Sequence, residues 1–99
     1  MTSAEFSVTV EGESLLVKVA GELDLATAPE LDACLRPVRG DVAVDCSGLD
    51  FIDSSGIRSL VEAHRAAEAR GDRLTIRNLP ENARRALEAV GLISILRIE

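Results

Sequence analysis

Residues 44–57 read VDCSGLDFIDSSGI, and this stretch decides how the rest of the chain is interpreted. An apolar strand ends in a polar loop, the loop ends in Asp-Ser-Ser-Gly, and an amphipathic helix begins directly afterwards. This order places hydroxyl groups at a helix N-terminus, where backbone N–H groups and the helix dipole favour negative charge. The stretch therefore predicts an α/β fold with a site that would tolerate a phosphate group.

The tetrapeptide Asp53-Ser54-Ser55-Gly56 has two interpretations. Asp and Ser are common helix caps, and Gly gives a loop conformational freedom, so the residues could be purely structural. Alternatively, the loop follows an inner strand at its carboxyl end, where open α/β sheets place their sites. Ser55 lies one residue further into the helix start, where capping is the commoner role. We therefore favour Ser54 as the phosphate acceptor and keep Ser55 as the alternative.

The residues before this stretch are typical of strands. Residues 6–10 alternate between apolar and polar side chains, and residues 15–20 form a second apolar segment. The short turn at 11–13 between them indicates an antiparallel hairpin. Gly21 is expected to end the second strand, and residues 21–26 are expected to form a loop.

A first helix is expected after that loop. Thr27 is the predicted N-cap, Glu30 completes a capping box, and Pro29 lies in the first turn, where its missing N–H costs nothing. Pro37 and Gly40 mark the end of the helix. Its apolar face comprises Leu31, Cys34, Leu35 and Val38.

Two further elements flank the Asp-Ser-Ser-Gly loop. A strand is predicted over residues 41–46, followed by the loop itself at 47–53 and a helix over 54–69. A fourth strand is expected over 73–77, with Leu74 and Ile76 facing inward. The helix is expected to bury Ile57, Leu60, Val61, His64 and Ala67.

A third helix and a final strand complete the predicted elements. Asn78, Pro80 and Glu81 repeat a helix start signal, with Asn78 as the cap. Gly91 is a suitable C-terminal stop, and residues 93–98 are the expected last strand. The apolar face of this helix comprises Ala83, Ala86, Leu87 and Val90.

The order of these elements, β-β-α-β-α-β-α-β, predicts the fold class. Strands that alternate with helices favour a largely parallel sheet with helical cover, and the N-terminal hairpin adds an antiparallel pair. We therefore expect a mixed sheet of four to five strands covered by helices. The 99 residues fit one domain, so residues 1–99 are predicted to form a single unit.

Composition narrows the classes of partner. The chain is 46% hydrophobic but has only two aromatic residues, Phe6 and Phe51, and its formal net charge is −6. Scarce aromatic side chains and an acidic surface both argue against nucleic-acid binding. Negative charge also disfavours anionic membrane surfaces. A protein partner with a basic patch is the better expectation.

The cysteines and the N-terminus indicate the cellular compartment. Cys34 and Cys46 are interpreted as reduced, mostly buried thiols, in preference to a disulfide or a redox pair. The first residues lack the basic and apolar regions of a secretory signal, and no apolar run approaches transmembrane length. We therefore expect a cytoplasmic protein that does not insert into membranes.

Catalytic chemistry finds little support in the sequence. His64 is the only histidine and has no second ligand at metal spacing. Ser54 and His64 share a helix and lie about 15 Å apart along its axis, which excludes a Ser-His-Asp triad. No glycine-rich phosphate loop occurs. We expect no catalytic residue, no metal and no cofactor, and hence no enzyme.

Two motifs together carry a family resemblance. GELD at 21–24, followed by Thr27-Ala28, and FIDSSGI at 51–57 resemble the STAS domain family, and more narrowly the bacterial anti-sigma factor antagonists. The similarity covers essentially the whole chain. In that family the Ser directly after the Asp is phosphorylated, which corresponds to Ser54, and the functional acid of the first motif corresponds to Asp24. From the residues alone, Asp24 could equally be a loop or cap residue.

The resemblance also implies partners. The unphosphorylated protein would bind an anti-sigma factor that is also a Ser/Thr kinase, and so release the sigma factor. Phosphorylation of Ser54 would end that binding, and a separate Ser/Thr phosphatase would restore it. Because Asp24, Asp50 and Asp53 already make this end acidic, a phosphate would repel a docked partner without refolding the domain. The predicted partner surface comprises Asp24, Asp53, Ser54, Ser55, Gly56 and Arg58.

Two alternatives remain open at this point. The chain could instead be a constitutive STAS adaptor subunit of a transporter ATPase, of the lipid-trafficking type, although the intact Asp-Ser-Ser-Gly motif argues mildly against this. A small hydrolase or nucleotide-binding enzyme is remote, because Ser54 has no neighbouring base.

Overall fold

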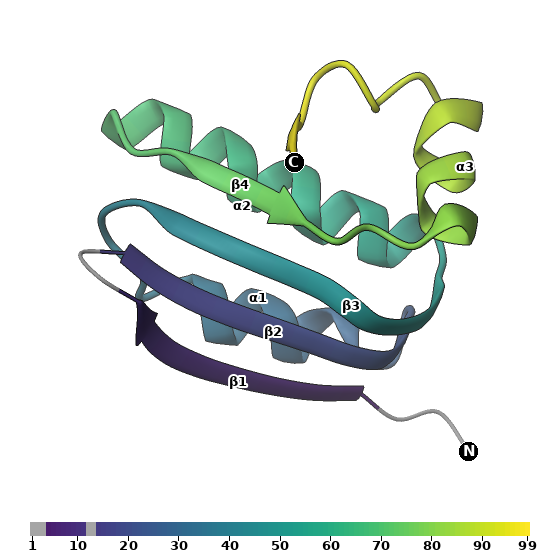
Figure 1. Ribbon diagram of the computed structural model, residues 1–99, viewed down its shortest axis with the longest axis horizontal. Coiled ribbons are helices and arrows are strands. Elements are labelled where there is room, and N and C mark those ends of the chain that lie inside the picture. The colour runs from purple at the N-terminus through teal and green to yellow at the C-terminus, as the bar shows by residue number, and fades with distance from the viewer. Residues whose placement is uncertain (1–3, 12–13) are drawn as a thin grey trace.

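The computed structural model describes residues 4–11 and 14–99 and has the predicted order of elements (Figure 1). One sheet contains all five strands in the order β1-β2-β3-β4-β5. β1 runs antiparallel to β2, and the other neighbours pair in parallel, which confirms the predicted mixed sheet. The elements are β1 (Ala4–Glu11), β2 (Ser14–Leu23), α1 (Ala28–Leu35), β3 (Val42–Ile52), α2 (Ser54–Arg70), β4 (Leu74–Arg77), α3 (Glu81–Ala89) and β5 (Arg97–Ile98).

The predicted hairpin between β1 and β2 is confirmed by their antiparallel register, from Ala4 opposite Gly21 to Glu11 opposite Ser14. Residues 12–13 of the turn predicted there lie outside the described residues. The buried strand side chains that pack under the helices are aliphatic or thiol, because burial of apolar surface stabilises the fold. The largest fully buried side chains are Val17, Val19, Leu23, Leu31, Val44, Cys46, Leu60, Ile76 and Leu87.

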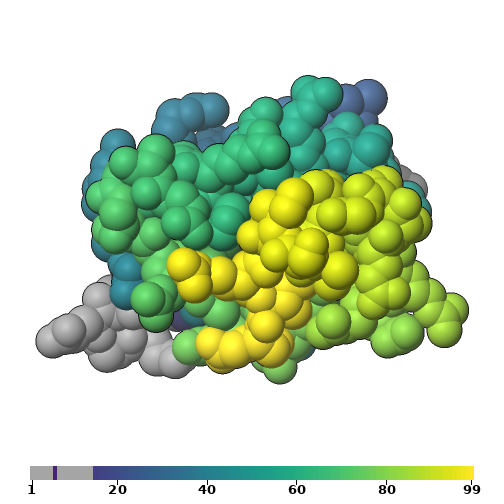
Figure 2. All heavy atoms as spheres, turned by 90° about the horizontal axis from the view of Figure 1, so that it is seen from above, coloured from purple at the N-terminus to yellow at the C-terminus, as the bar shows by residue number. Residues whose placement is uncertain are grey.

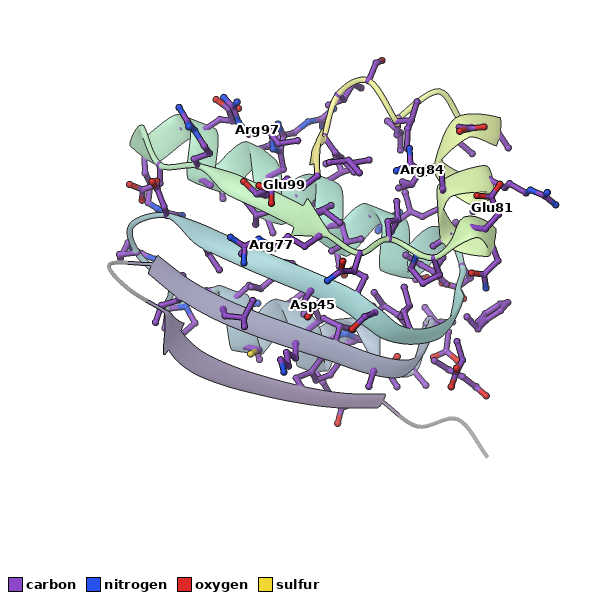
Figure 3. All side chains as sticks on the ribbon, in the orientation of Figure 1. Asp45, Arg77, Glu81, Arg84, Arg97 and Glu99 are labelled. Atoms are coloured by element: carbon purple, nitrogen blue, oxygen red, sulfur yellow. The ribbon has the colours of Figure 1, made fainter. Side chains whose placement is uncertain are left out.

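α1 and α2 pack against each other on one face of the sheet (Figure 1). On the opposite face, Arg77 of β4 pairs with Glu99, with 3.3 Å between Nε and Oε1, and Asp45 lies on the neighbouring strand (Figure 3). Seen from above, the C-terminal segment lies between α3 and the C-terminal half of α2 (Figure 2). Arg97 there approaches Glu68 of α2, with 3.5 Å between Nη2 and Oε1.

β2 and β3 are longer than predicted. Gly21 does not end β2: the strand continues to Leu23, with register shifts around Lys18/Ala20 and Gly21/Glu22 that mark a bulge. β3 likewise continues through the segment 47–52, which was expected to be a loop. Gly48 permits this close pairing, because a Cβ there would lie 2.9 Å from Cβ of Ala20. The predicted polar loop therefore shrinks to Asp53 alone.

The predicted start signals of α1 and α3 act differently from expectation. Thr27 is the N-cap of α1, but its side chain makes no cap hydrogen bond, so the predicted capping box with Glu30 does not form. α3 begins after Pro80, not after Asn78. Asn78 adopts a left-handed conformation, with φ of 55°, and its amide donates to Oδ1 of Asp45 at 3.1 Å. A tertiary acceptor on β3 therefore replaces the local helix cap.

The C-terminal residues also depart from prediction. Val90 was placed on the buried face of α3, yet its side chain is 57% exposed, because the helix ends at Ala89 and the chain turns at Gly91. The last strand comprises only Arg97–Ile98 instead of residues 93–98. Leu96 supplies the buried contact of this segment.

The two cysteines are free thiols, in agreement with their interpretation from sequence. Cys34 is half-buried on α1, and Cys46 is buried on β3. His64 is buried on the inner face of α2, as predicted, with Nε2 3.5 Å from Oε1 of Glu68.

Candidate phosphoacceptor site at the start of helix α2

The site lies where β2 and β3 end and α2 begins, at the carboxyl ends of these strands on the right in Figure 1. Leu23 and Ile52 pair at the ends of the two parallel strands. The N–H of Asp53 then donates to the carbonyl of Leu23 at 3.1 Å, and Ser54 is the first residue of α2. The Asp-Ser-Ser-Gly motif therefore lies at the carboxyl ends of two adjacent strands, as expected for a site in this fold class, and Ser54 is its exposed residue.

Asp53 holds the two motifs of the site together. Its Oδ1 accepts hydrogen bonds from the N–H groups of Ser55 at 2.9 Å and Gly56 at 3.1 Å, so it is the N-cap of α2. Its Oδ2 accepts from the N–H of Leu25 at 3.2 Å, in the loop that follows β2. The side chain of half-buried Asp53 therefore accepts hydrogen bonds from backbone N–H groups of both the helix and the loop. This gives Asp53 a structural role in addition to the partner contact predicted for it.

Asp24 organises the loop between β2 and α1. Its Oδ1 accepts from the N–H groups of Ala26 at 3.0 Å and Thr27 at 3.2 Å, and lies 3.3 Å from Oγ1 of Thr27. Thr27, buried itself, donates from Oγ1 to the carbonyl of Glu22 at 2.7 Å. Over residues 4–11 and 14–99, no hydrogen bond joins Asp24 to Ser54. Asp24 therefore fixes the shape of the loop between β2 and α1.

Gly56 allows α2 to pack closely on the strand ends. A Cβ at this position would lie 2.7 Å from Cγ of Leu23, 2.8 Å from the carbonyl oxygen of Leu23 and 2.8 Å from Cγ1 of Ile52. Such distances are shorter than any van der Waals contact. Gly56 is also buried, so its contribution to the site is this close packing and not a side-chain contact with a partner.

The two serines differ in accessibility. Ser54 is exposed, whereas Ser55 is half-buried, and Arg58 is exposed one turn further along α2. The N–H groups of Ser55 and Gly56 are already bonded to Asp53, and the N–H of Ile57 is bonded to the carbonyl of Asp53. A phosphate on Ser54 would therefore find these first-turn donors occupied, and would remain hydrated at the surface instead of resting on them.

Two exposed apolar side chains belong to the segments next to this site and were not singled out as site residues from the sequence. Leu25 is 76% exposed in the loop whose N–H bonds to Asp53, and Phe51 is 49% exposed near the end of β3. Exposed Asp50 lies next to Phe51, and its carbonyl accepts from the side-chain amide of Asn82 on α3 at 3.0 Å. Large exposed apolar side chains beside polar ones are typical of protein-binding surfaces.

Two other features, a metal site and a membrane span, were sought within the part of the chain that the structure describes. That part contains no group of three or more His, Cys, Asp or Glu side chains arranged to hold a metal ion. None of its helices combines the length and the apolar character needed to cross a membrane.

Known proteins match the chain over nearly its full length. The family model described as "Mlab, STAS domain" matches residues 6–97. The anti-sigma-B factor antagonist of Staphylococcus aureus (strain NCTC 8325 / PS 47) is 30% identical over 94 residues, which cover 91% of this chain and 87% of the relative.

Solved structures agree at the level of the fold. An anti-sigma factor antagonist from Mycobacterium paratuberculosis superposes with a TM-score of 0.88 at 22% identity, covering 97% of this chain and 85% of that one. The Bacillus cell fate determinant SpoIIAA in its phosphorylated form gives a TM-score of 0.74 at 22% identity, covering 96% and 91%. These matches confirm the resemblance drawn from the GELD and FIDSSGI motifs. The chain therefore belongs to the STAS domain family and, within it, to the anti-sigma factor antagonists, which are regulatory binding proteins.

Proposed function

We propose that this chain binds an anti-sigma factor which is also a Ser/Thr kinase, and that phosphorylation of Ser54 by that kinase ends the binding. A Ser/Thr phosphatase would then restore the unphosphorylated form. The observation that carries the proposal is exposed Ser54 at the first position of α2. Exposed Phe51 lies three residues before it, and exposed Leu25 lies in the loop that bonds to Asp53. A relative of the same fold, SpoIIAA, is known in a phosphorylated form, which supports the same chemistry here.

The unphosphorylated surface suits a protein partner. Leu25 and Phe51 supply apolar area that a partner would bury, and Asp53 fixes the loop and the helix start relative to each other. Because these backbone segments are already held by hydrogen bonds, little conformational entropy would be lost on binding. The acidic neighbours Asp24 and Asp50 favour a partner with basic residues around its own apolar centre.

Phosphorylation would reverse this preference. A phosphate on Ser54 adds about −1.5 to −2 charges directly after Asp53 in the chain. Since the first-turn donors are occupied, the phosphate would have to lose its hydration when a partner docks. A repulsion and desolvation cost of only about 3 kcal/mol would weaken binding roughly a hundredfold. The switch would act through the surface, while the fold remains unchanged.

The experiment uses the full chain as bait, in wild-type form and as Ser54→Ala, Ser54→Asp and Ser55→Ala, with partners and phosphosites identified by mass spectrometry. Wild type, Ser54→Ala and Ser55→Ala should retain a Ser/Thr kinase that Ser54→Asp loses. With ATP, wild type and Ser55→Ala should be phosphorylated at residue 54 and released. A transporter ATPase retained by all four baits, or phosphate found only on Ser55, would contradict the proposal.

The apolar contacts give a separate prediction. Leu25→Ser and Phe51→Ser should each weaken binding of the captured kinase about tenfold or more, because each removes a large side chain from the centre of the surface. Neither change should alter the unfolding midpoint appreciably. Val90→Ser is the matched control, since Val90 is similarly exposed but lies at the end of α3. Equal losses for Val90→Ser, measured by calorimetry, would show that the surface lies elsewhere.

A further inference from the structure

A groove between α1 and α2 is not used by the phosphoacceptor site. It has a cavity volume of about 360 Å³, within the range of roughly 300–1,000 Å³ typical of small-molecule sites. Its α2 lining begins at Ser59 and ends at Arg70, so it extends along the helix away from Ser54. Four of the apolar residues that line it are buried members of the core, Leu35, Val38, Val42 and Leu74, and Ala63 and Ala66 of α2 line it as well.

The charged side chains of the groove are divided between its two ends. The positively charged side chains lie at the end where α1 and α2 both finish, and they are Arg36, Arg39 and Arg70. The two helix ends are close together, since the N–H of Gly40, which follows α1, donates to Oδ2 of Asp72, which follows α2, at 3.0 Å. The acidic lining residues Asp32 and Glu62 lie earlier on the same helices, by about one and two turns respectively. A chain with a net charge of −6 thus concentrates cations at one end of one groove.

The arginines differ in how far they are engaged. Arg39 donates from Nη1 to the carbonyls of Arg36 and Val38, both at 2.8 Å. Arg70 donates from Nε to Oδ2 of Asp72 at 3.1 Å, which neutralises part of its charge. Arg36 is exposed and has no ion pair among the described residues. At the positive end of the groove, the guanidinium group of Arg36 is therefore available to a ligand. The guanidinium group of Arg39 has further N–H donors besides those on Nη1.

Arg70 is paired with Asp72, so the guanidinium groups of Arg36 and Arg39 are the ones that can bind a small anion here. A carboxylate carries one charge and matches the planar, two-donor geometry of guanidinium groups. The apolar floor favours a hydrocarbon chain for the rest of the ligand.

We propose that the groove between α1 and α2 binds a small amphipathic carboxylate, a medium-chain fatty acid in chemical class. The carboxylate would contact Arg36 and Arg39, and the hydrocarbon chain would lie along Leu35, Val38 and Leu74 toward Ala63 of α2. The inference does not depend on the phosphorylation of Ser54, because none of the groove residues belongs to that site.

Octanoate is the probe, with octan-1-ol as the uncharged analogue of the same length. Amide NMR titration of the full chain should show octanoate shifting signals from Leu35 to Arg39 and from Glu62 to Ala66. Octan-1-ol should bind at least about fivefold more weakly, because it lacks the charge-assisted hydrogen bonds. Arg36→Gln should weaken octanoate about fivefold and leave octan-1-ol unchanged. Arg85→Gln on α3, an exposed arginine remote from the groove, should change neither.

A second variant tests the apolar part of the groove. Ala63→Leu places a larger side chain inside the lining while keeping a good helix former, so both probes should lose binding about tenfold or more with the unfolding midpoint retained. The proposal would be overturned by octanoate shifts centred on α3 or the outer sheet face. Equal affinity for octan-1-ol, or equal weakening by Arg85→Gln, would also overturn it.

Discussion

Asp53 is the residue on which the geometry of the site depends most. One carboxylate caps α2 through Oδ1 and holds the neighbouring loop through Oδ2. The capping part was predictable from the local order Asp-Ser-Ser-Gly, because a cap involves only the next three residues. The bond to Leu25 was not, since it joins residues 28 positions apart and depends on β2 and β3 being neighbours.

Substitution of Asp53 should separate these two roles. Asp53→Ala loses both, and we expect the free energy of unfolding to fall by about 1–2 kcal/mol, as for other N-cap losses. Asp53→Asn should cost less, because its amide oxygen can still cap the helix while its NH₂ group cannot accept from Leu25. Chemical denaturation gives the free energies.

Amide hydrogen exchange provides the control for this prediction. The Leu25 amide should exchange faster in both variants, whereas the Ser55 and Gly56 amides should exchange faster only in Asp53→Ala. If Asp53→Asn left exchange at Leu25 unchanged, the link between loop and helix would not depend on the second oxygen.

At the scale of elements, prediction succeeded where the pattern is local. α2 was predicted over 54–69 and spans Ser54–Arg70, because its apolar spacing, N-cap and terminal Gly71 agree. The outer half of β3 was missed, because its polar residues pair with β2 only across the bulge near Gly48. Whether such a segment forms a strand depends on pairing with residues that are distant in the sequence, and the sequence of the segment alone does not predict that pairing.

Asn78 shows how a tertiary contact overrides a local signal. The order Asn, Pro, acid is typical of a helix start, yet Asn78 turns the chain with positive φ and donates to Asp45 on β3. That bond links β3 to the connection between β4 and α3. Left-handed backbone is tolerated by Asn better than by most other residues, which explains its presence at the turn.

The pKa of Asp45 reports this link. It lies below its ordinary value, chiefly because the N–H of Ser47 donates to the carboxylate, and also because of the Asn78 amide and nearby Lys18. Asn78→Gly keeps the backbone conformation but removes the amide, so the pKa of Asp45 should rise without reaching its ordinary value. Carboxyl NMR titration measures the change. The pKa of Asp72, lowered by Arg70 and the N–H of Gly40, should stay as it is.

The sign of the linked stability follows from the direction of that shift. Since the pKa of Asp45 is lowered on folding, its contribution is present above the unfolded pKa and is lost as pH falls through the folded pKa. Asn78→Gly should therefore show a smaller loss of stability on acidification below about pH 4 than the wild type. A larger loss would show that the amide does not favour the ionised carboxylate.

At the scale of the whole molecule, the fold class was predictable, while the surfaces were not. The proposal of Ser54 as phosphoacceptor rests on one short motif, but the exposure of Leu25 and Phe51 depends on how β2, β3 and the loop assemble. The groove between α1 and α2 likewise requires two helices to be placed on one sheet face. Surfaces of this kind arise from the way helices and strands pack together. Hydrophobic periodicity predicts only whether a side chain faces inward or outward, and not which elements become neighbours.

The buried thiol of Cys46 makes the stability of the whole molecule sensitive to alkaline pH. Burial, and secondarily the charge of Asp45, raises the pKa of Cys46 from 9.0 to about 12. The unfolded chain therefore loses this proton first, so stability should fall as pH rises above about 9 and continue to fall toward 12. The chain has no tyrosine and only one lysine, Lys18, so few other side chains change charge below pH 10.

Urea unfolding of Cys34→Ser under reducing conditions isolates the Cys46 effect, because Cys34 also has a pKa raised by burial. Between pH 8 and pH 10 the free energy of unfolding should fall by about 1.5 kcal/mol, because over this range the Cys46 thiol ionises in the unfolded chain but not in the folded protein. The double variant Cys34→Ser/Cys46→Ala starts from a lower stability, because it leaves a small void in the core, but its profile should be flat over the same range. If the two profiles fell in parallel, the Cys46 thiol would be as free to ionise in the folded protein as in the unfolded chain. The sheet beneath α1 and α2 would then admit water, contrary to the 1% exposure of this side chain.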